Sequence, residues 1–265
     1  MSEEGSMTIS DRVAIVTGAG HGIGRAIAVA LAKAGAHVAA VDIDPAAAEA
    51  TATAVGKLGR RSVGLAVDVG DVAAIDKMVR GVVEAMGPPD ILVNNAGVTR
   101  RAHIMDLTEQ DWDRIMRVNG KGVFFCLQRV AREMIPRRSG MIVNIASIAG
   151  KGFVGASNTI YAASKGAVLG LTRLAARELA PHNINVNAIC PGTTVTALSE
   201  ANLRDRAREQ GVSVEEMARR RNASIPLGRP NDPEDVAALA VFLAGPGARN
   251  ITGQSFNVDG GIIFD

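Results

Sequence analysis

An apolar run that passes through closely spaced glycines into a helical pattern constrains this chain more than any other feature. Residues 13–16 are all apolar, as in a strand buried on both faces, and apolar residues recur at helical spacing from Ile23 onward. Gly18, Gly22 and Gly24 lie between them with the spacing G-x-x-x-G-x-G. Glycines at such a turn let backbone amides approach a ligand closely, and the N-terminus of the following helix attracts negative charge. The stretch therefore predicts a strand, a tight turn and a helix that bind a pyrophosphate.

The same alternation of strand and helix continues along the chain. Strand-like runs occupy residues 12–17, 37–41, 62–67, 91–94, 141–146, 185–189 and 254–258. Helical runs lie between them, at residues 24–34, 45–57, 72–86, 108–137, 161–179 and 233–243. Such alternation predicts a parallel sheet with helices on both faces. We expect a flexible N-terminal extension at residues 1–10 and one α/β domain at 11–265, a Rossmann-type doubly wound parallel sheet of about seven strands.

Charge and cysteine content exclude several classes of protein. The formal net charge is only +2 and charges of both signs are interspersed, so no nucleic acid and no membrane surface is expected as a partner. No apolar run reaches the roughly 18 residues of a membrane-spanning helix. Cys126 and Cys190 are far apart in the sequence, which favours buried thiols in a reducing compartment, the cytoplasm. His37, His103 and His182 show no clustered spacing, so we expect no catalytic metal.

Residues 197–222 break the alternation. This segment is polar, helix-prone and rich in Arg and Glu, and it is too long for an ordinary connection between a strand and a helix. We expect a lid that closes over the substrate. The alternative is a solvated pair of surface helices without a functional motion.

Asp42 is the second sign of a dinucleotide site, because it ends the second predicted strand. A carboxylate at that place accepts hydrogen bonds from the adenosine ribose and repels the extra phosphate of NADP, so NAD is the expected cofactor. Asp42 or Asp44 can also cap the helix that starts near Pro45, and the two roles are compatible. Asp68, which ends the next strand, suits a turn as well as a contact to adenine.

Together these motifs resemble those of the short-chain dehydrogenase/reductase family over nearly all of residues 11–265. They are TGAGHGIG at 17–24, Asp42, DV at 68–69, NNAG at 94–97, Asn119, Ser147, Y-x-x-x-K at 161–165, PG at 191–192 with Thr196, and NVDGG at 257–261. The resemblance implies that the cofactor lies along Gly18, Gly22, Ile23 and Gly24 at the pyrophosphate, Asp68 and Val69 at the adenine, Asn95, Ala96 and Gly97 at the adenosine ribose, and Thr194 and Thr196 at the nicotinamide. His21, Tyr161, Lys165, Pro191 and Gly192 complete this predicted set.

Tyr161 and Lys165 lie four residues apart and therefore on one face of the same predicted helix. A phenol with a pKa near 10 is a poor base at neutral pH unless positive charge favours its anion, and Lys165 with an oxidised nicotinamide supplies that charge. We expect Tyr161 to be the general acid/base. Ser147 is expected to hydrogen-bond the substrate oxygen, with Ser157 as a weaker competitor. Asn119 is expected to help carry protons from Lys165 to solvent through water.

Three functions are consistent with these residues. The leading one is an NAD(H)-dependent dehydrogenase that acts on a small-molecule secondary alcohol or its ketone, such as a polyol, sugar or cyclic alcohol. The second is 3-oxoacyl-[acyl-carrier-protein] reductase, although that activity usually goes with NADPH, which Asp42 disfavours. The third is a family member without catalysis that senses the cofactor or acts as a scaffold. The resemblance also implies a homotetramer, and small residues along the 161–179 helix allow another helix to approach closely.

Overall fold

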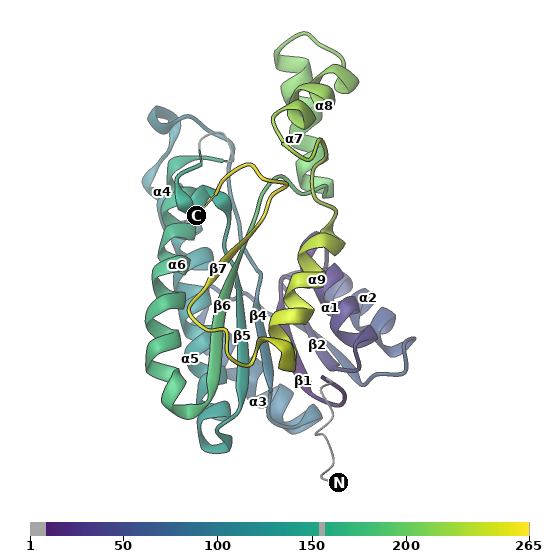
Figure 1. Cartoon of the computed structure of the whole chain (residues 1–265), viewed down its shortest axis with the longest axis vertical. Helices are drawn as coiled ribbons and strands as arrows, with labels where there is room; N and C mark the ends of the chain where they lie inside the picture. Colours follow the sequence, from purple (N-terminus) through teal and green to yellow (C-terminus); the bar gives the residue numbers. More distant parts are fainter. Residues whose placement is uncertain (1–8, 154–156, 265) are drawn as a thin grey trace.

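The protein folds around one parallel sheet with the strand order β3-β2-β1-β4-β5-β6-β7, seen in the computed structural model that describes residues 9–153 and 157–264 (Figure 1). The strands are β1 (Val13–Thr17), β2 (His37–Asp42), β3 (Ser62–Ala66), β4 (Ile91–Asn94), β5 (Gly140–Ile145), β6 (Ile184–Pro191) and β7 (Ser255–Val258). Every neighbouring pair is parallel. The predicted seven-stranded doubly wound α/β fold is confirmed.

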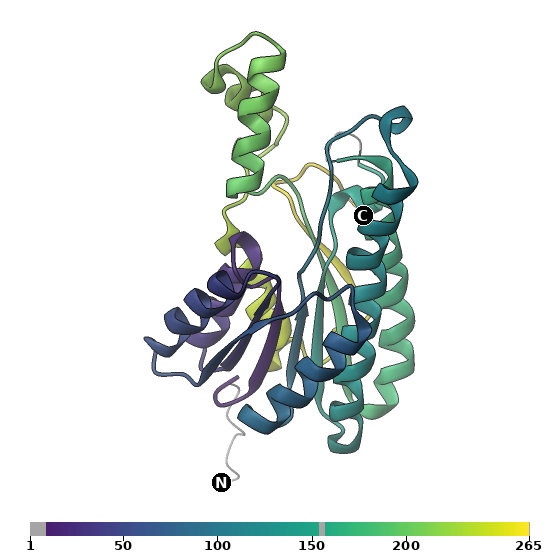
Figure 2. The same ribbon diagram turned by 180° about the vertical axis from the view of Figure 1, so that it is seen from behind.

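Helices cover both faces of this sheet (Figures 1 and 2). The α-helices are α1 (Gly22–Lys33), α2 (Pro45–Gly56), α3 (Val72–Met86), α4 (Glu109–Met116), α5 (Val123–Met134), α6 (Thr159–Leu179), α7 (Ala197–Glu209), α8 (Val214–Ala223) and α9 (Pro233–Ala244). Residues of α1, α2 and α9 pack on one face, and residues of α3, α5 and α6 on the other.

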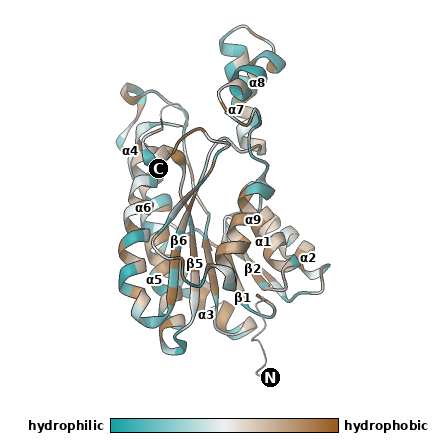
Figure 3. Ribbon diagram, in the orientation of Figure 1, coloured by the Kyte–Doolittle hydropathy of each residue, from teal (hydrophilic) through white to brown (hydrophobic). Residues whose placement is uncertain are grey.

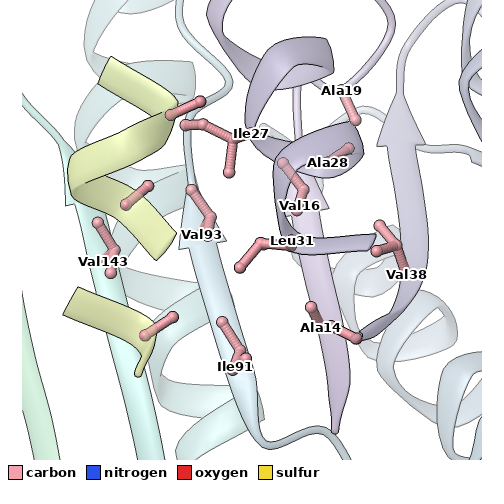
Figure 4. Packing of buried hydrophobic residues seen from close by; sticks show 14 of the residues in the cluster. Ala14, Val16, Ala19, Ile27, Ala28, Leu31, Val38, Ile91, Val93 and Val143 are labelled. Carbon is pink, nitrogen blue, oxygen red and sulfur yellow. The ribbon is translucent and has the colours of Figure 1, made fainter. Parts of the chain in front are cut away.

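Alternate residues of the central strands face the two layers of helices. Ala14 and Val16 of β1 pack with Ile27 and Leu31 of α1, as Figure 4 shows, whereas Ile15 packs with the opposite layer. Both faces of the strand are therefore apolar, which accounts for its uninterrupted apolar sequence. When the ribbon is coloured by hydropathy, hydrophobic residues are seen along the strands in the middle of the sheet (Figure 3).

The order of the strands fixes where a ligand can bind. After β1 the chain winds outward to β2 and β3, and it then returns to place β4 on the other side of β1. The two crossovers leave β1 and β4 in opposite directions, and a doubly wound sheet binds its ligands in the crevice at the carboxyl ends of these strands.

The packed body begins earlier than predicted. Of the predicted extension at residues 1–10, only Ile9 and Ser10 are among the described residues. Ile9 is 3% exposed and belongs to the core beside α1. Ser10 packs against Gly35, where an added Cβ would lie 2.7 Å from its hydroxyl oxygen.

The predicted helix at 108–137 is not one regular α-helix. It is divided into α4 and α5 by a π-helical turn at Arg117–Gly122, and a short 3-10 turn ends it. Asn119 lies in the π-helical turn and is fully buried. Its side chain bonds the backbone of Val98, a distant contact that the sequence periodicity does not contain.

The segment at 197–222 forms the helix pair α7–α8, which projects beyond the sheet in both views (Figures 1 and 2). The pair has a small apolar cluster of its own, made of Leu203, Ala207 and Met217. A bidentate ion pair from Arg101 to Glu209, at 3.0 and 2.6 Å, connects it to the loop that follows β4. The helical content was predicted, and a lid motion stays a prediction.

Candidate active site

A cavity of about 420 Å³ opens at the carboxyl ends of the central strands. Segments that follow β1, β4, β5 and β6 meet there with α4 and α6. Its lining residues are Ile23, Asn95, Gly97, Val98, Thr99, Arg114, Ile145, Ala146, Ser147, Tyr161, Lys165, Pro191, Gly192, Thr194 and Thr196. The cavity thus lies in the crevice that the order of the strands predicts.

The glycine turn after β1 is fixed against the turn after β4. The Thr17 hydroxyl accepts hydrogen bonds from the backbone amides of Asn95 and Ala96, at 3.0 and 3.1 Å. The side-chain amide of Asn95 donates to the carbonyls of Thr17 and Gly18, both at 3.0 Å. Gly18 has a φ of +62°, and a Cβ there would lie 2.8 Å from Ala96 Cα. Asn95 therefore acts as a brace between the two turns.

The N-terminus of α1 fits a bound diphosphate. Its N-cap is His21, whose side chain makes no capping hydrogen bond, so the first-turn amides receive no acceptor from that residue. Gly22 has a φ of +51°, and a Cβ there would come within 3.1 Å of Thr196 Cγ2. Glycine thus keeps the space between the helix N-terminus and Thr196 open. Amides at a helix N-terminus beside open space form an anion site.

Asp42 presents its carboxylate to the glycine turn. One oxygen accepts a hydrogen bond from the Gly20 amide at 2.8 Å, and the other accepts from the Asp44 amide at 3.1 Å. Asp44 is the residue whose side chain caps α2. The cap assigned in the sequence to either aspartate therefore belongs to Asp44, and Asp42 holds a negative charge at the carboxyl end of β2.

Asp68 and Val69 lie farther along the same edge of the sheet. Burial opposes ionisation of Asp68, but hydrogen bonds from Arg117 and the Gly70 amide outweigh it and lower the pKa of the carboxyl. Val69 is buried, and its carbonyl oxygen lies where a Cβ on Gly122 would approach to 2.7 Å. Asp68 is thus anchored as an anion next to the π-helical turn.

Ser147 and Tyr161 meet inside the cavity. Ser147 directly follows Ala146 after β5, whereas Tyr161 lies in the first turn of α6, where Asn158 caps the helix through the Tyr161 amide at 2.8 Å. Burial raises the pKa of Tyr161, and a hydrogen bond with Ser147 partly offsets it. Ser157 lies 2.7 Å from the Thr99 hydroxyl and is not among the residues that line the cavity. The geometry favours Ser147 over Ser157 as partner of the phenol.

Lys165 is buried below Tyr161. Its ammonium nitrogen donates to the Ile145 carbonyl at 2.7 Å and lies 5.7 Å from the centroid of the tyrosine ring. Burial lowers the pKa of Lys165 to about 8, with an opposing effect of Cys190. In the protein alone Lys165 does not depress the pKa of Tyr161, because burial dominates and the ammonium group bonds a carbonyl of β5.

The side chain of Asn119 forms its hydrogen bonds with other groups of the protein. Its amide nitrogen donates to the Val98 carbonyl at 2.9 Å and to the Ser164 hydroxyl at 3.0 Å, and its oxygen accepts from the Val98 amide at 2.8 Å. A Cβ on Gly97 would lie 3.4 Å from Asn119 Oδ1 and 3.5 Å from Lys165 Nζ. Asn119 thus fixes the loop after β4 next to Lys165, and a direct proton transfer through its side chain has no support in these contacts.

The cavity brings together many but not all of the predicted residues. Ile23, Asn95, Gly97, Ser147, Tyr161, Lys165, Pro191, Gly192, Thr194 and Thr196 line it. The remaining predicted residues lie at the adjoining glycine turn, along the edge of the sheet or, for Asn119, behind the cavity wall. Sequence reasoning missed Val98, Thr99, Arg114, Ile145 and Ala146. Val98 and Ala146 directly adjoin predicted motifs and Thr99 and Ile145 lie one residue further away, whereas nothing in the sequence signalled Arg114.

No group of three or more His, Cys, Asp or Glu side chains suited to a metal ion occurs in the described part of the chain. Within the same residues, no helix has both the length and the apolar character needed to cross a bilayer.

A seven-stranded doubly wound sheet, with uncapped helix amides after its first strand and a half-buried Tyr161 beside a buried Lys165, is typical of nicotinamide-dependent oxidoreductases. A family model described as "Enoyl-(Acyl carrier protein) reductase" matches residues 18–263. The chain belongs to the short-chain dehydrogenase/reductase family.

Individual relatives are similar over most of the chain. The 3-oxoacyl-[acyl-carrier-protein] reductase FabG of Thermotoga maritima is 42% identical over 198 residues, which are 75% of this chain and 76% of the relative. An NAD⁺-bound xylitol dehydrogenase is 33% identical, with a TM-score of 0.89 over 96% of this chain and 99% of its own. A dehydrogenase from Agrobacterium tumefaciens with bound NADP is 39% identical, with a TM-score of 0.83 over 98% and 99%.

Proposed function

We propose that this protein transfers a hydride between NAD(H) and a secondary alcohol or its ketone. The proposal rests mainly on one observation: Ser147, Tyr161 and Lys165 line one cavity next to the N-terminus of α1. The bound nicotinamide supplies or accepts the hydride. The residues of the chain bind and orient the substrate and move the proton.

Each of these residues has a separate task. The Tyr161 hydroxyl donates its proton to the carbonyl oxygen during reduction and takes it back during oxidation. Ser147 lines the cavity together with Tyr161 and holds the substrate oxygen beside the phenol. Lys165, with a pKa of about 8, supplies positive charge and replaces the proton. Asn119 keeps the wall of the cavity in place through Val98.

NAD is the proposed cofactor because Asp42 places a carboxylate at the glycine turn. The carboxylate accepts ribose hydroxyls and repels a phosphate on the same ribose. The relative with bound NAD⁺ supports this choice, whereas the relative with bound NADP leaves it to be tested. The test is hydride transfer measured by NADH and NADPH absorbance side by side, and equal efficiency with both cofactors would refute the NAD preference.

A second candidate is 3-oxoacyl-[acyl-carrier-protein] reductase, because the FabG relative carries that name at 42% identity. The two functions differ in the substrate that they admit. We expect small cyclic or polyhydroxylated secondary alcohols to be oxidised with a higher kcat/KM than short 3-hydroxyacyl thioesters with NAD⁺. A 3-oxoacyl thioester that is reduced by NADH faster than every small ketone would favour the second candidate.

We propose that the α7–α8 pair is a lid. Its root is Thr196, which lines the cavity and caps α7, and the Arg101–Glu209 ion pair lies at its far end. None of the described side chains of α7 or α8 lines the cavity, so this arrangement corresponds to an open lid. Closure predicts slower proteolytic cleavage within residues 197–222 when NADH and a ketone are both bound. Cleavage unaffected by either ligand would contradict closure.

We also propose a cytoplasmic homotetramer. Cys126 and Cys190 are both buried, and buried cysteines far apart in the sequence suit a reducing compartment. A hollow between α4, α5 and α6 is lined by Met116, Phe124, Ala167 and Leu171 among others, and Phe124 is 40% exposed. Apolar surface of this kind supports packing of the α5 and α6 helices against a second copy.

A further inference from the structure

The cavity is lined by cationic side chains and by no acidic one among the described residues. Arg114 and Lys165 are the charged residues of its lining. Lys165 is buried beside Tyr161, whereas Arg114 is exposed and reaches the cavity from the last turn of α4. The two cations therefore differ, because Lys165 is buried beside the proposed acid/base, whereas Arg114 is accessible to solvent.

Other arginines around the same crevice are neutralised by carboxylates. The pairs are Arg100 with Asp111, Arg101 with Glu209, and Arg117 with Asp68. Arg114 differs from them, because within residues 9–153 and 157–264 it has no ion pair. Its hydrogen bond there runs from Nη2 to the backbone carbonyl of Thr99, at 3.1 Å. The positive charge of Arg114 is thus left without a protein counter-charge at the cavity.

The contact with Thr99 orients the guanidinium and leaves most of its donors for a ligand. A guanidinium has five N–H groups in a planar fork that matches a carboxylate with two parallel hydrogen bonds. One of these groups bonds Thr99, and that loop is itself fixed by the bond between the Thr99 and Ser157 hydroxyls. A phosphate dianion generally calls for more than one accessible cation, and the lining offers one such group.

We propose that Arg114 binds a carboxylate on the substrate, so that this enzyme prefers hydroxy acids and keto acids to uncharged alcohols and ketones. The proposal rests on the hydride transfer proposed above and adds the substrate class. The reacting oxygen lies between Ser147 and Tyr161, and the carboxylate extends toward α4. Arg114 is then the specificity-determining residue of the cavity.

The test compares each acid with its uncharged methyl ester. The probes are 3-hydroxybutyrate, 4-hydroxypentanoate and 5-hydroxyhexanoate with their methyl esters, each with saturating NAD⁺, on the wild type, Arg114→Gln and Arg114→Lys. We expect the wild type to prefer at least one acid over its ester. Arg114→Gln should lower kcat/KM for that acid by roughly 10- to 100-fold, the effect of one charged hydrogen-bonded contact, and should lower kcat/KM for the ester by a clearly smaller factor. Arg114→Lys should recover part of the loss.

A binding measurement separates this proposal from the proposed function. Calorimetry of 4-oxopentanoate and of its methyl ester against the protein–NADH complex needs no turnover, and only the acid should bind more weakly to Arg114→Gln. An equal loss for acid and ester would mean that Arg114 only supports the Thr99 loop, and a matching loss of NADH affinity would assign it to the cofactor; either result overturns the proposal. Normal ester turnover without any acid preference in the wild type also overturns it, whereas absence of all turnover refutes the proposed function alone.

Discussion

The ammonium nitrogen of Lys165 lies 2.7 Å from the carbonyl oxygen of Ile145, and the lysine is 3% exposed. A carbonyl satisfies one donor of the ammonium group but carries no full counter-charge. Burial therefore lowers the pKa of Lys165 from 10.5 to about 8. The folded protein holds the proton of Lys165 less firmly than the unfolded chain does.

This difference predicts how stability depends on pH. Between pH 8 and 10.5 the unfolded lysine binds more protons than the folded one, so the free energy of unfolding rises with pH in this window. Relative to Lys165→Met, which has no such group, the wild type should gain about 3 kcal/mol across it. Urea unfolding at matched protein concentrations measures the gain. Parallel pH profiles for the two proteins would contradict a depressed pKa.

Replacement of Tyr161 by Phe should abolish turnover without unfolding the protein. Only the hydroxyl is removed, so the ring retains its packing, but the proton donor to the substrate oxygen is lost. Such a group contributes ~10²–10⁴-fold to the rate. NADH binding, followed by fluorescence, should persist. A variant that keeps more than about a tenth of the rate would show that another group transfers the proton.

Ser147→Ala and Ser157→Ala form a matched pair. Ser147 lines the cavity together with Tyr161, whereas Ser157 is not among the lining residues and its hydroxyl lies 2.7 Å from that of Thr99. We expect the first change to lower kcat strongly and the second to leave kcat near that of the wild type. Steady-state kinetics with one alcohol and NAD⁺ measures kcat for both variants. A larger loss of kcat in Ser157→Ala than in Ser147→Ala would assign the contact with the substrate oxygen to Ser157.

Asp42→Asn and Asp42→Ala separate charge from hydrogen bonding. Asparagine keeps an oxygen for the Gly20 amide and removes the charge, whereas alanine removes both. The wild type should prefer NAD over NADP by about tenfold or more, which corresponds to ~1.4 kcal/mol. Both variants should lose part of this preference, and alanine should also weaken NAD binding more than asparagine does. Unchanged cofactor ratios in both variants would mean that Asp42 does not discriminate.

Phe124→Asp should dissociate the proposed tetramer. The phenylalanine is 40% exposed beside the apolar hollow between α4, α5 and α6, and a carboxylate there would have to be buried in an interface. Leu58→Asp is the matched control, because Leu58 is also 40% exposed but lies at the end of α2. Light scattering should give a smaller mass for the first variant only. A monomeric wild type at micromolar concentration would refute the assembly itself.

The elements of this fold were predictable because their signals are local. The apolar run of β1, the glycines after it and Pro233 at the start of α9 each act within a few residues of themselves. The π-helical turn was not predictable, because it accompanies contacts of Asn119 with Val98 and Ser164, up to 45 residues away. The hydrophobic periodicity of a sequence reports only local structure and cannot predict contacts between residues so far apart.

The site was predictable where a residue type is rare or repeats a pattern. Tyr161 is the single tyrosine of the chain, and its spacing to Lys165 places both on one helical face. Arg114 is one arginine among many, and only the folded chain shows that neighbouring arginines form ion pairs whereas Arg114 forms none with the described residues. The raised pKa of Tyr161 was also hidden, because burial depends on what packs around the phenol.

The apolar cluster shared by α7 and α8 allows this helix pair to evolve separately from the sheet. Leu203, Ala207 and Met217 pack on one another, so the helix pair draws its cohesion from within and little from the sheet. We therefore expect substitutions along its outer surface to leave the glycine turn and the surroundings of Tyr161 unchanged. Thr196, the N-cap of α7, is the point at which a different helix pair could follow the same cavity wall. Natural selection can therefore replace the α7–α8 helix pair beside the cavity while Ser147, Tyr161 and Lys165 stay the same.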